Sequence, residues 1–184
     1  MKKTIFVILP FIFIFNFIGC ATNNLVQNEN FVHGEQRFFE ETGGFSITIP
    51  RMWHITNMPS SRYRVIRGPS ENGFAPPLIV FSIDTFDGSL DLMTDTVIAY
   101  LILLAENFRL IYRSEFETLN NLNGERMIIT YTVHGQEVRQ VIYSFLGIEN
   151  NMSIMISCTV VAEAGELFDE RFDRMAKTFE WATQ

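Results

Sequence analysis

Histidine, cysteine and positive charge are scarce in this sequence, and each shortage narrows what the protein can do. There are three histidines and two cysteines among 184 residues. None stands at a metal-ligand spacing such as His-Glu-x-x-His or Cys-x-x-Cys, and His33, His54 and His134 are interpreted as surface histidines. Acidic residues outnumber lysine plus arginine by 21 to 14, which gives no electrostatic attraction to nucleic acid. We expect no metal, no cofactor and no nucleic-acid partner.

Recognisable catalytic motifs are also missing. The segment at Gly68-Pro69-Ser70 resembles a serine nucleophile elbow only superficially, because the Gly-x-Ser-x-Gly spacing and the flanking strand and helix are absent. Four aspartates cluster around the expected start of a helix: Asp84, Asp87, Asp91 and Asp95. They lack the spacing and terminal glutamate of a calcium loop, so we interpret them as helix-capping and dipole-pairing residues. We therefore expect no enzymatic activity.

The N-terminal segment is apolar, short and preceded by two lysines. Its apolar stretch, 5–18, falls below the roughly 18–20 residues that a membrane-spanning helix needs. It ends in Phe17-Ile18-Gly19-Cys20, which resembles a lipobox, although phenylalanine replaces the leucine usual at its first position. The sequence predicts a bacterial lipoprotein signal at 1–19 and lipid attachment at Cys20. An ordinary signal cut nearby and an uncleaved anchor are the alternatives.

Lipidation predicts that the protein faces an extracytoplasmic space of the bacterial cell envelope. Stable anchoring takes more than one acyl chain, a condition that a diacylated or triacylated cysteine meets. No second apolar run approaches spanning length. We expect the lipid to provide membrane attachment and an envelope protein to be the partner.

The rest of the chain divides into a tether and one domain. Residues 20–37 are rich in asparagine and glutamine and lack periodicity, as is typical of a flexible tether. Residues 38–184 are enough for a domain that buries about two-thirds of its unfolded surface. With Cys20 carrying lipid, Cys158 has no disulfide partner, and its alternating apolar neighbours predict a buried, unreactive thiol.

Periodicity within the domain predicts strands, a helix, further strands and a closing helix. Strands are expected at 45–49, 63–67, 78–83, 110–119, 125–134, 137–146 and 152–161, with hairpin turns at Asn123-Gly124 and His134-Gly135. Apolar residues recur every three or four positions from Ser89, a plausible cap, to Phe108. A second apolar stripe comprises Ala164, Phe168, Phe172, Met175 and Phe179, with Asp169, Glu170, Asp173, Arg174 and Lys177 on the other side. The fold class is α+β, an antiparallel sheet of about six to seven strands covered by two main helices.

Short motifs along 38–182 resemble the PsbP-like superfamily, which includes bacterial PsbP/DcrB-like lipoproteins. They are Phe45-Ser46-Ile47-Thr48-Ile49-Pro50-Arg51-Met52-Trp53, Arg67-Gly68-Pro69, Leu122-Asn123-Gly124 and Thr178-Phe179-Glu180-Trp181. Other members are photosystem II extrinsic proteins and a nuclear Ran-binding protein. The resemblance implies a PsbP-like fold and a domain that binds proteins rather than a shared reaction, and it assigns no functional residue.

The middle helix is apolar beyond the stripe that is expected to face the sheet. Its additional apolar residues are Leu92, Ala99 and Leu103 on the opposite face, with Ile98 and Ile102 on the flank. A surface helix ordinarily carries charges there. Either a neighbouring loop or tether segment covers these residues, or they form a docking face for a protein or an acyl chain. Phe74, in the loop 70–77, is either a buried loop anchor or a further partner contact.

Two classes of function follow, and a third is disfavoured. The preferred one is a membrane-tethered, non-catalytic module that binds or assembles envelope proteins. The alternative is a carrier or sensor of a hydrophobic small molecule or lipid, for which a cavity lined by Leu101, Leu104 and phenylalanine-rich strands is expected. An enzyme would require a cleft with convergent carboxylates of strongly shifted pKa.

Overall fold

The computed structural model describes residues 30–31, 35–58, 61–147 and 151–182. Its strands are β1 Asn30–Phe31, β2 Gln36–Glu40, β3 Phe45–Ile49, β4 His54–Thr56, β5 Val65–Arg67, β6 Leu78–Thr85, β7 Glu106–Glu117, β8 Asn123–Val133, β9 Gln136–Leu146, β10 Met152–Val161 and β11 Glu180–Trp181. Its α-helices are α1 Leu90–Leu104 and α2 Asp169–Lys177, and a 3-10 turn lies at Ala162–Ala164. None of the helices in these ranges is long and apolar enough to cross a bilayer.

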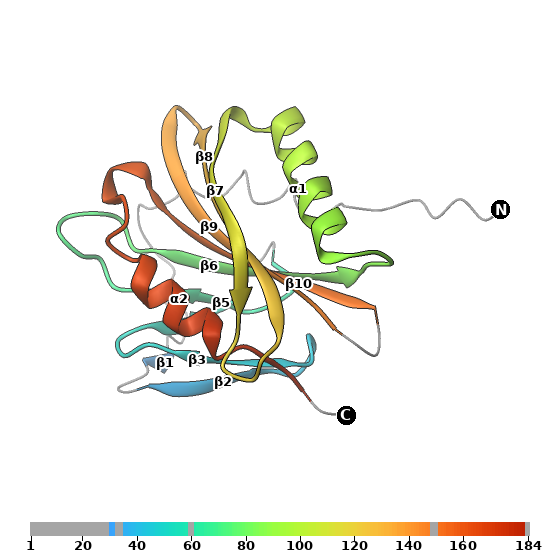
Figure 1. Cartoon of the computed structure of the whole chain (residues 1–184). Coiled ribbons are helices and arrows are strands. Elements are labelled where there is room, and N and C mark those ends of the chain that lie inside the picture. Colours follow the sequence, from blue (N-terminus) through green and yellow to red (C-terminus); the bar gives the residue numbers. More distant parts are fainter. Residues whose placement is uncertain (1–29, 32–34, 59–60, 148–150, 183–184) are drawn as a thin grey trace.

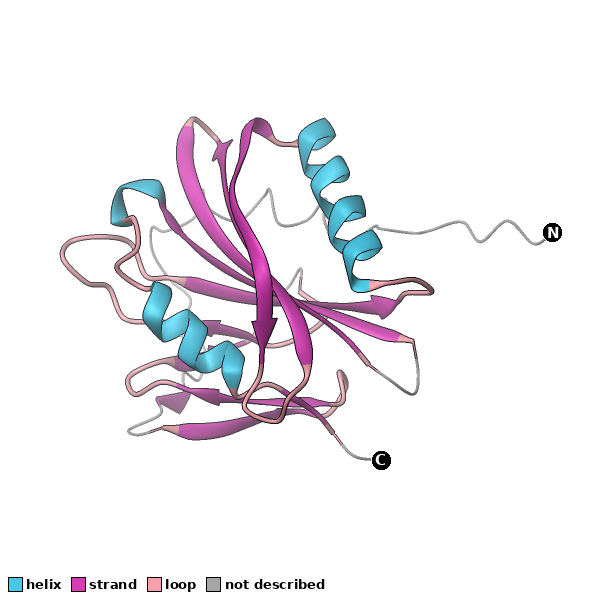
Figure 2. Ribbon diagram, in the orientation of Figure 1, coloured by secondary structure: helices cyan, strands magenta, loops and turns pink. Residues whose placement is uncertain are grey.

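The strands form two antiparallel sheets (Figures 1 and 2). The large sheet has eight strands in the order β1-β4-β5-β6-β10-β9-β8-β7, and the small sheet has three in the order β11-β3-β2. The expected α+β class, with an antiparallel sheet and two helices, is confirmed. The large sheet exceeds the expected six to seven strands because β1 and β4 are too short to show an alternating pattern.

The two faces of the large sheet carry separate cores. On one face, α2 and the small sheet enclose aromatic residues such as Tyr143, Phe145 and Phe179, all fully buried. On the other face, α1 packs through Val97 and Leu101 on alternate residues of β8 and β9. The two helices therefore lie on opposite sides of the sheet, since successive strand residues point to opposite faces.

Two boundaries differ from the expected ones. The expected tether contains β1, which pairs with β4, and the first two residues of β2. The expected signal and residues 20–29 lie outside the described residues. The middle helix ends at Leu104 rather than at Phe108, because Ala105 is extended (φ −92°, ψ 127°) and β7 begins at the next residue. Phe108 still packs against the α1 core, which explains why it matched the helical period.

The Asn123-Gly124 dipeptide lies at the start of β8 and not in the expected turn, which spans 118–122. Gly124 is buried. A Cβ atom at this position would stand 2.7 Å from the backbone oxygen of Ser144 and closer still to the ring of Phe145. Glycine is therefore required for the close approach of β8 to β9, not for turn geometry.

An ionic network attaches α2 to the large sheet and corrects another expectation. Arg139 donates to both carboxylate oxygens of Asp169, at 2.6 and 2.8 Å. Arg126 donates to Asp169 at 3.3 Å and to Asp173 at 2.7 Å, and the Tyr143 hydroxyl also donates to Asp173, at 2.5 Å. Both aspartates were expected on the solvent side. They face the sheet because their spacing of four places them on one flank of α2, where two arginines of low exposure need partners.

Candidate functional site

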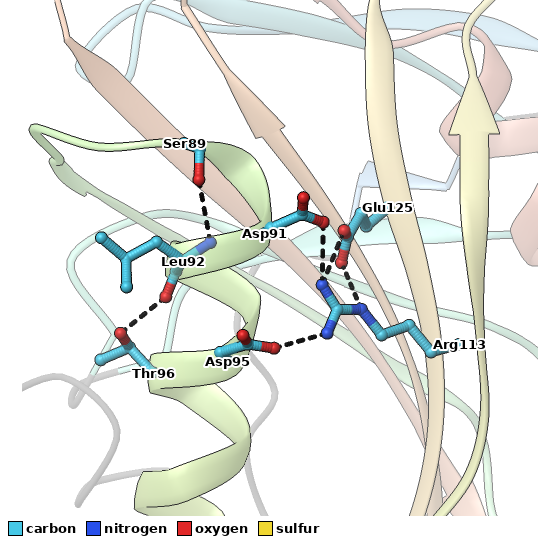
Figure 3. A network of polar contacts seen from close by, with 7 residues as sticks. All are labelled: Ser89, Asp91, Leu92, Asp95, Thr96, Arg113 and Glu125. Atoms are coloured by element: carbon cyan, nitrogen blue, oxygen red, sulfur yellow. Dashed lines mark hydrogen bonds and ion pairs between the residues drawn. The ribbon is translucent and has the colours of Figure 1, made fainter.

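The N-terminal half of α1 is held against β7 and β8 by one arginine (Figure 3). Arg113 of β7 donates two hydrogen bonds to Glu125 of β8, at 2.9 and 2.8 Å. It also donates to Asp95 at 2.5 Å and to Asp91 at 3.2 Å, both on α1. The Ser89 hydroxyl accepts the Leu92 N–H at 3.2 Å, which confirms the expected helix cap. The three carboxylates around the guanidinium therefore belong to one closed cluster.

The electrostatics of this cluster centre on the pairing of Arg113 with Glu125. Burial alone would raise the pKa of Glu125, but the hydrogen bonds that it accepts from the positively charged Arg113 favour the ionised form, and its pKa lies below the ordinary value. The pKa of Asp91 is raised, chiefly by its hydrogen bond with Glu125. The hydrogen bond to Glu125 also raises the pKa of Arg113. The cluster thus fixes α1 on the sheet and offers no free acid–base pair.

A half-open hollow of about 540 Å³ lies beside this cluster. It is lined by Ser89, Leu90, Asp91, Glu115, Phe116, Glu117, Asn123, Gly124 and Glu125. Glu115 stands directly opposite Glu125 in the β7–β8 ladder, so two acids share one cross-strand pair. Within the described ranges, no group of three or more histidine, cysteine or acidic side chains is arranged to hold a metal ion. The hollow is therefore acidic, with Arg113 beside it.

The same side of the molecule exposes an unusual number of apolar side chains. We define the α1–β7 surface as Leu92, Ile102, Leu103 and Leu104 of α1 with Leu110 and Ile111 of β7. Leu103 is 79% exposed, and every member is at least 41% exposed. Because Arg113 contacts Asp91 and Asp95, the next residues of that helical row, Ile98 and Ile102, also face β7. The helix and the strand are therefore neighbours, and both expose apolar side chains (Figure 1).

The residues that the sequence singled out are only partly brought together. Leu92, Ala99, Ile102 and Leu103 are exposed on α1, whereas Ile98 is half-buried against the α1 core. Phe74 packs against the other core, on the opposite face of the large sheet, as a loop anchor does. Sequence reasoning missed the β7 members of the surface. Their one signal is Leu110-Ile111-Tyr112, three consecutive apolar residues that break the expected alternation.

Cys158 is fully buried in the aromatic core, and burial raises the pKa of its thiol well above the ordinary value. A buried neutral thiol is a poor nucleophile. This placement agrees with an unreactive structural cysteine.

Neither the comparison with protein-family models nor the search of curated proteins finds a match. Solved structures do match. The mycobacterial protein LpqN, involved in cell envelope biogenesis of Mycobacterium tuberculosis, aligns with a TM-score of 0.61 and 12% identity over 81% of this chain and 91% of its own. Cyanobacterial PsbP from Synechocystis aligns with a TM-score of 0.58 and 12% identity over 88% of this chain and 98% of its own. The Saccharomyces cerevisiae Ran-binding protein Mog1p aligns with a TM-score of 0.58 and 13% identity over 82% of this chain and 96% of its own. The chain therefore has the PsbP-like fold that its motifs predicted.

Proposed function

We propose that this protein is a lipid-anchored, non-catalytic module of the bacterial envelope that binds another protein through the α1–β7 surface. The observation that carries the proposal is the exposure of six large apolar side chains on one helix and the strand beside it. Large apolar side chains that gather on neighbouring elements and stay exposed often mark a site that a partner covers. The covering partner is a protein, because the patch includes a strand whose outer edge can form backbone hydrogen bonds.

Two further observations support this role. Among the proteins of the same fold, one is involved in cell envelope biogenesis and another binds Ran, so both an envelope role and protein binding occur with this fold. The polar cluster around Arg113 is closed by three carboxylates and serves to position α1. The carrier alternative is less favoured because the hollow is lined mainly by polar and acidic residues, while Leu101 is packed in the α1 core.

The docking face can be tested in cells with a photo-crosslinking residue. Placed at Leu103, the probe is expected to trap a discrete protein, whereas the same probe at the equally exposed Glu170 of α2 traps none. Replacing Ile102 and Leu104 with lysine should remove the Leu103 crosslink, with a change in stability within about 0.5 kcal/mol for each exposed position. Equal crosslinking from Leu103 and Glu170, or recovery of lipid alone, would contradict the docking proposal.

The anchor is tested separately by mass spectrometry of the native protein. We expect a chain that begins at Cys20 and carries lipid on its sulfur. Cys20→Ser should move the protein from the membrane fraction to the soluble fraction, whereas Cys158→Ala should leave it at the membrane, because only Cys20 follows the expected signal. An unmodified sulfur with the leader still attached would overturn the lipid anchor without affecting the docking face.

A further inference from the structure

The outer edge of β7 is open for strand addition. β7 is the last strand of the large sheet, and β8 is its only neighbour among the described strands. The register with β8 shifts near Leu110 but is unbroken from Tyr112 to Glu117. A regular edge of this length presents backbone N–H and C=O groups that an extended peptide can pair with.

Successive side chains of β7 point to opposite faces of the large sheet, and the two faces carry different residue types. Phe116 lies on the aromatic-core side, where its ring centroid is 4.8 Å from that of Tyr143, and alternation places Tyr112 and Ser114 on the same side. Arg113 points to α1, so Glu115 and Glu117 share the α1 side and line the hollow. An added strand would therefore meet aromatic side chains on one face and acids on the other.

The acids on the α1 side are not neutralised within the fold. Arg113 is already surrounded by Asp91, Asp95 and Glu125. Glu115 and Glu117 are both exposed, and neither forms an ion pair with another described residue. Complementary positive charge on a partner would pair with them at the mouth of the hollow.

From this geometry we infer that the β7 edge between Tyr112 and Glu117 binds an extended segment of a partner protein in which basic residues alternate with apolar ones. The basic side chains lie over Glu115 and Glu117, and the apolar side chains lie over Tyr112 and Phe116. Backbone pairing to β7 supplies affinity, and the two-faced alternation supplies specificity. This inference rests on the proposed function, because it names the chemistry of the partner that covers the α1–β7 surface.

The test uses the full mature chain in detergent and a fluorescent peptide in which lysine alternates with valine. We expect saturable binding by fluorescence anisotropy. Glu115→Lys with Glu117→Lys should weaken it by about tenfold or more, equivalent to about 1.4 kcal/mol. The doubly substituted protein should instead bind the matching peptide in which glutamate alternates with valine. The control is Glu163→Lys with Glu170→Lys, which makes the same change in net charge at exposed sites away from β7.

Two further peptides separate strand addition from simple charge attraction. A peptide with the same lysines and valines in two blocks should bind more weakly, since it cannot place one residue type on each face. Methylating alternate backbone nitrogens of the alternating peptide should abolish binding in one of the two possible patterns, because one edge then loses its donors.

Equal weakening by the β7 and control substitutions would overturn the inference, as would equal binding of the block peptide. Self-association of the chain that the peptide fails to displace would also overturn it, by making a second copy the occupant of the edge. If no peptide binds while the Leu103 crosslink persists, the inference fails and the proposed function stands. If the crosslink is absent as well, both fail.

Discussion

Replacing Phe179 with alanine is expected to lower the free energy of unfolding by about 3–5 kcal/mol, the range for truncating a fully buried phenylalanine. The Phe179 ring is fully buried and stacks on Phe145 of the large sheet, with centroids 4.8 Å apart and planes 11° apart. It also packs against Phe45 of β3 and Trp181 of β11, with ring centroids 5.9 and 5.3 Å away, respectively. One side chain therefore joins the two sheets, so its loss leaves a cavity that neither sheet can fill alone.

The measurement is equilibrium denaturation followed by circular dichroism. Because domains have only about 5–15 kcal/mol of stability, the variant should show a large drop in denaturation midpoint. Phe39→Ala, in β2, is the matched control, since this phenylalanine is 48% exposed and should cost much less. A loss below about 1 kcal/mol for Phe179→Ala would mean that the junction between the sheets is not tightly packed.

Asp169→Ala is expected to have the second-largest effect, a loss of about 3–5 kcal/mol, because it leaves a buried charge without its partner. Arg139, whose side chain is only 9% exposed, donates both of its hydrogen bonds in this network to Asp169. Arg126 would keep its bond to Asp173 but lose the one to Asp169. The cost arises mainly from the stranded Arg139 guanidinium rather than from the net strength of the ion pair.

This explanation makes a specific prediction for the paired variant. Asp169→Leu combined with Arg139→Met should be less destabilising than Asp169→Ala alone, because removing both charges leaves no unpaired ion. Glu170→Ala is the surface control: its side chain is 88% exposed and pairs with Arg174 at 3.0 Å, as the helical spacing predicted. That control should cost no more than about 0.5 kcal/mol. Equal losses for Asp169→Ala and Glu170→Ala would contradict the buried network.

The sequence predicted the elements of this fold better than their partners. Strict alternation located β3, and positive φ values at His134-Gly135 confirm the predicted hairpin turn there. Alternation did not reveal that β3 belongs to the small sheet, because a strand shows which face is buried but not which strands lie beside it. For the same reason, the sequence predicted that Asp169 and Asp173 face solvent. Only the structure shows that the arginines of β8 and β9 lie opposite them.

The candidate site divides in the same way. The α1 members, such as Leu103, could be predicted because a surface helix with apolar residues on both faces is unusual. The β7 members could not, because lying at the edge of a sheet is a property of topology rather than of Leu110 and Ile111 themselves. The motif resemblance predicted the fold, whereas the position of β7 at the edge of the large sheet is seen only in the structure.

The small sheet also bears on when the fold can be completed during synthesis. Its central strand, β3, lies early in the sequence, yet one of its two neighbours is β11, where Trp181 pairs with Phe45. The sheet therefore cannot close until the ribosome has made residues 180–181, and contacts between such distant segments form slowly. A nascent chain that has not yet reached β11 therefore lacks one of the two neighbours of β3 in the small sheet.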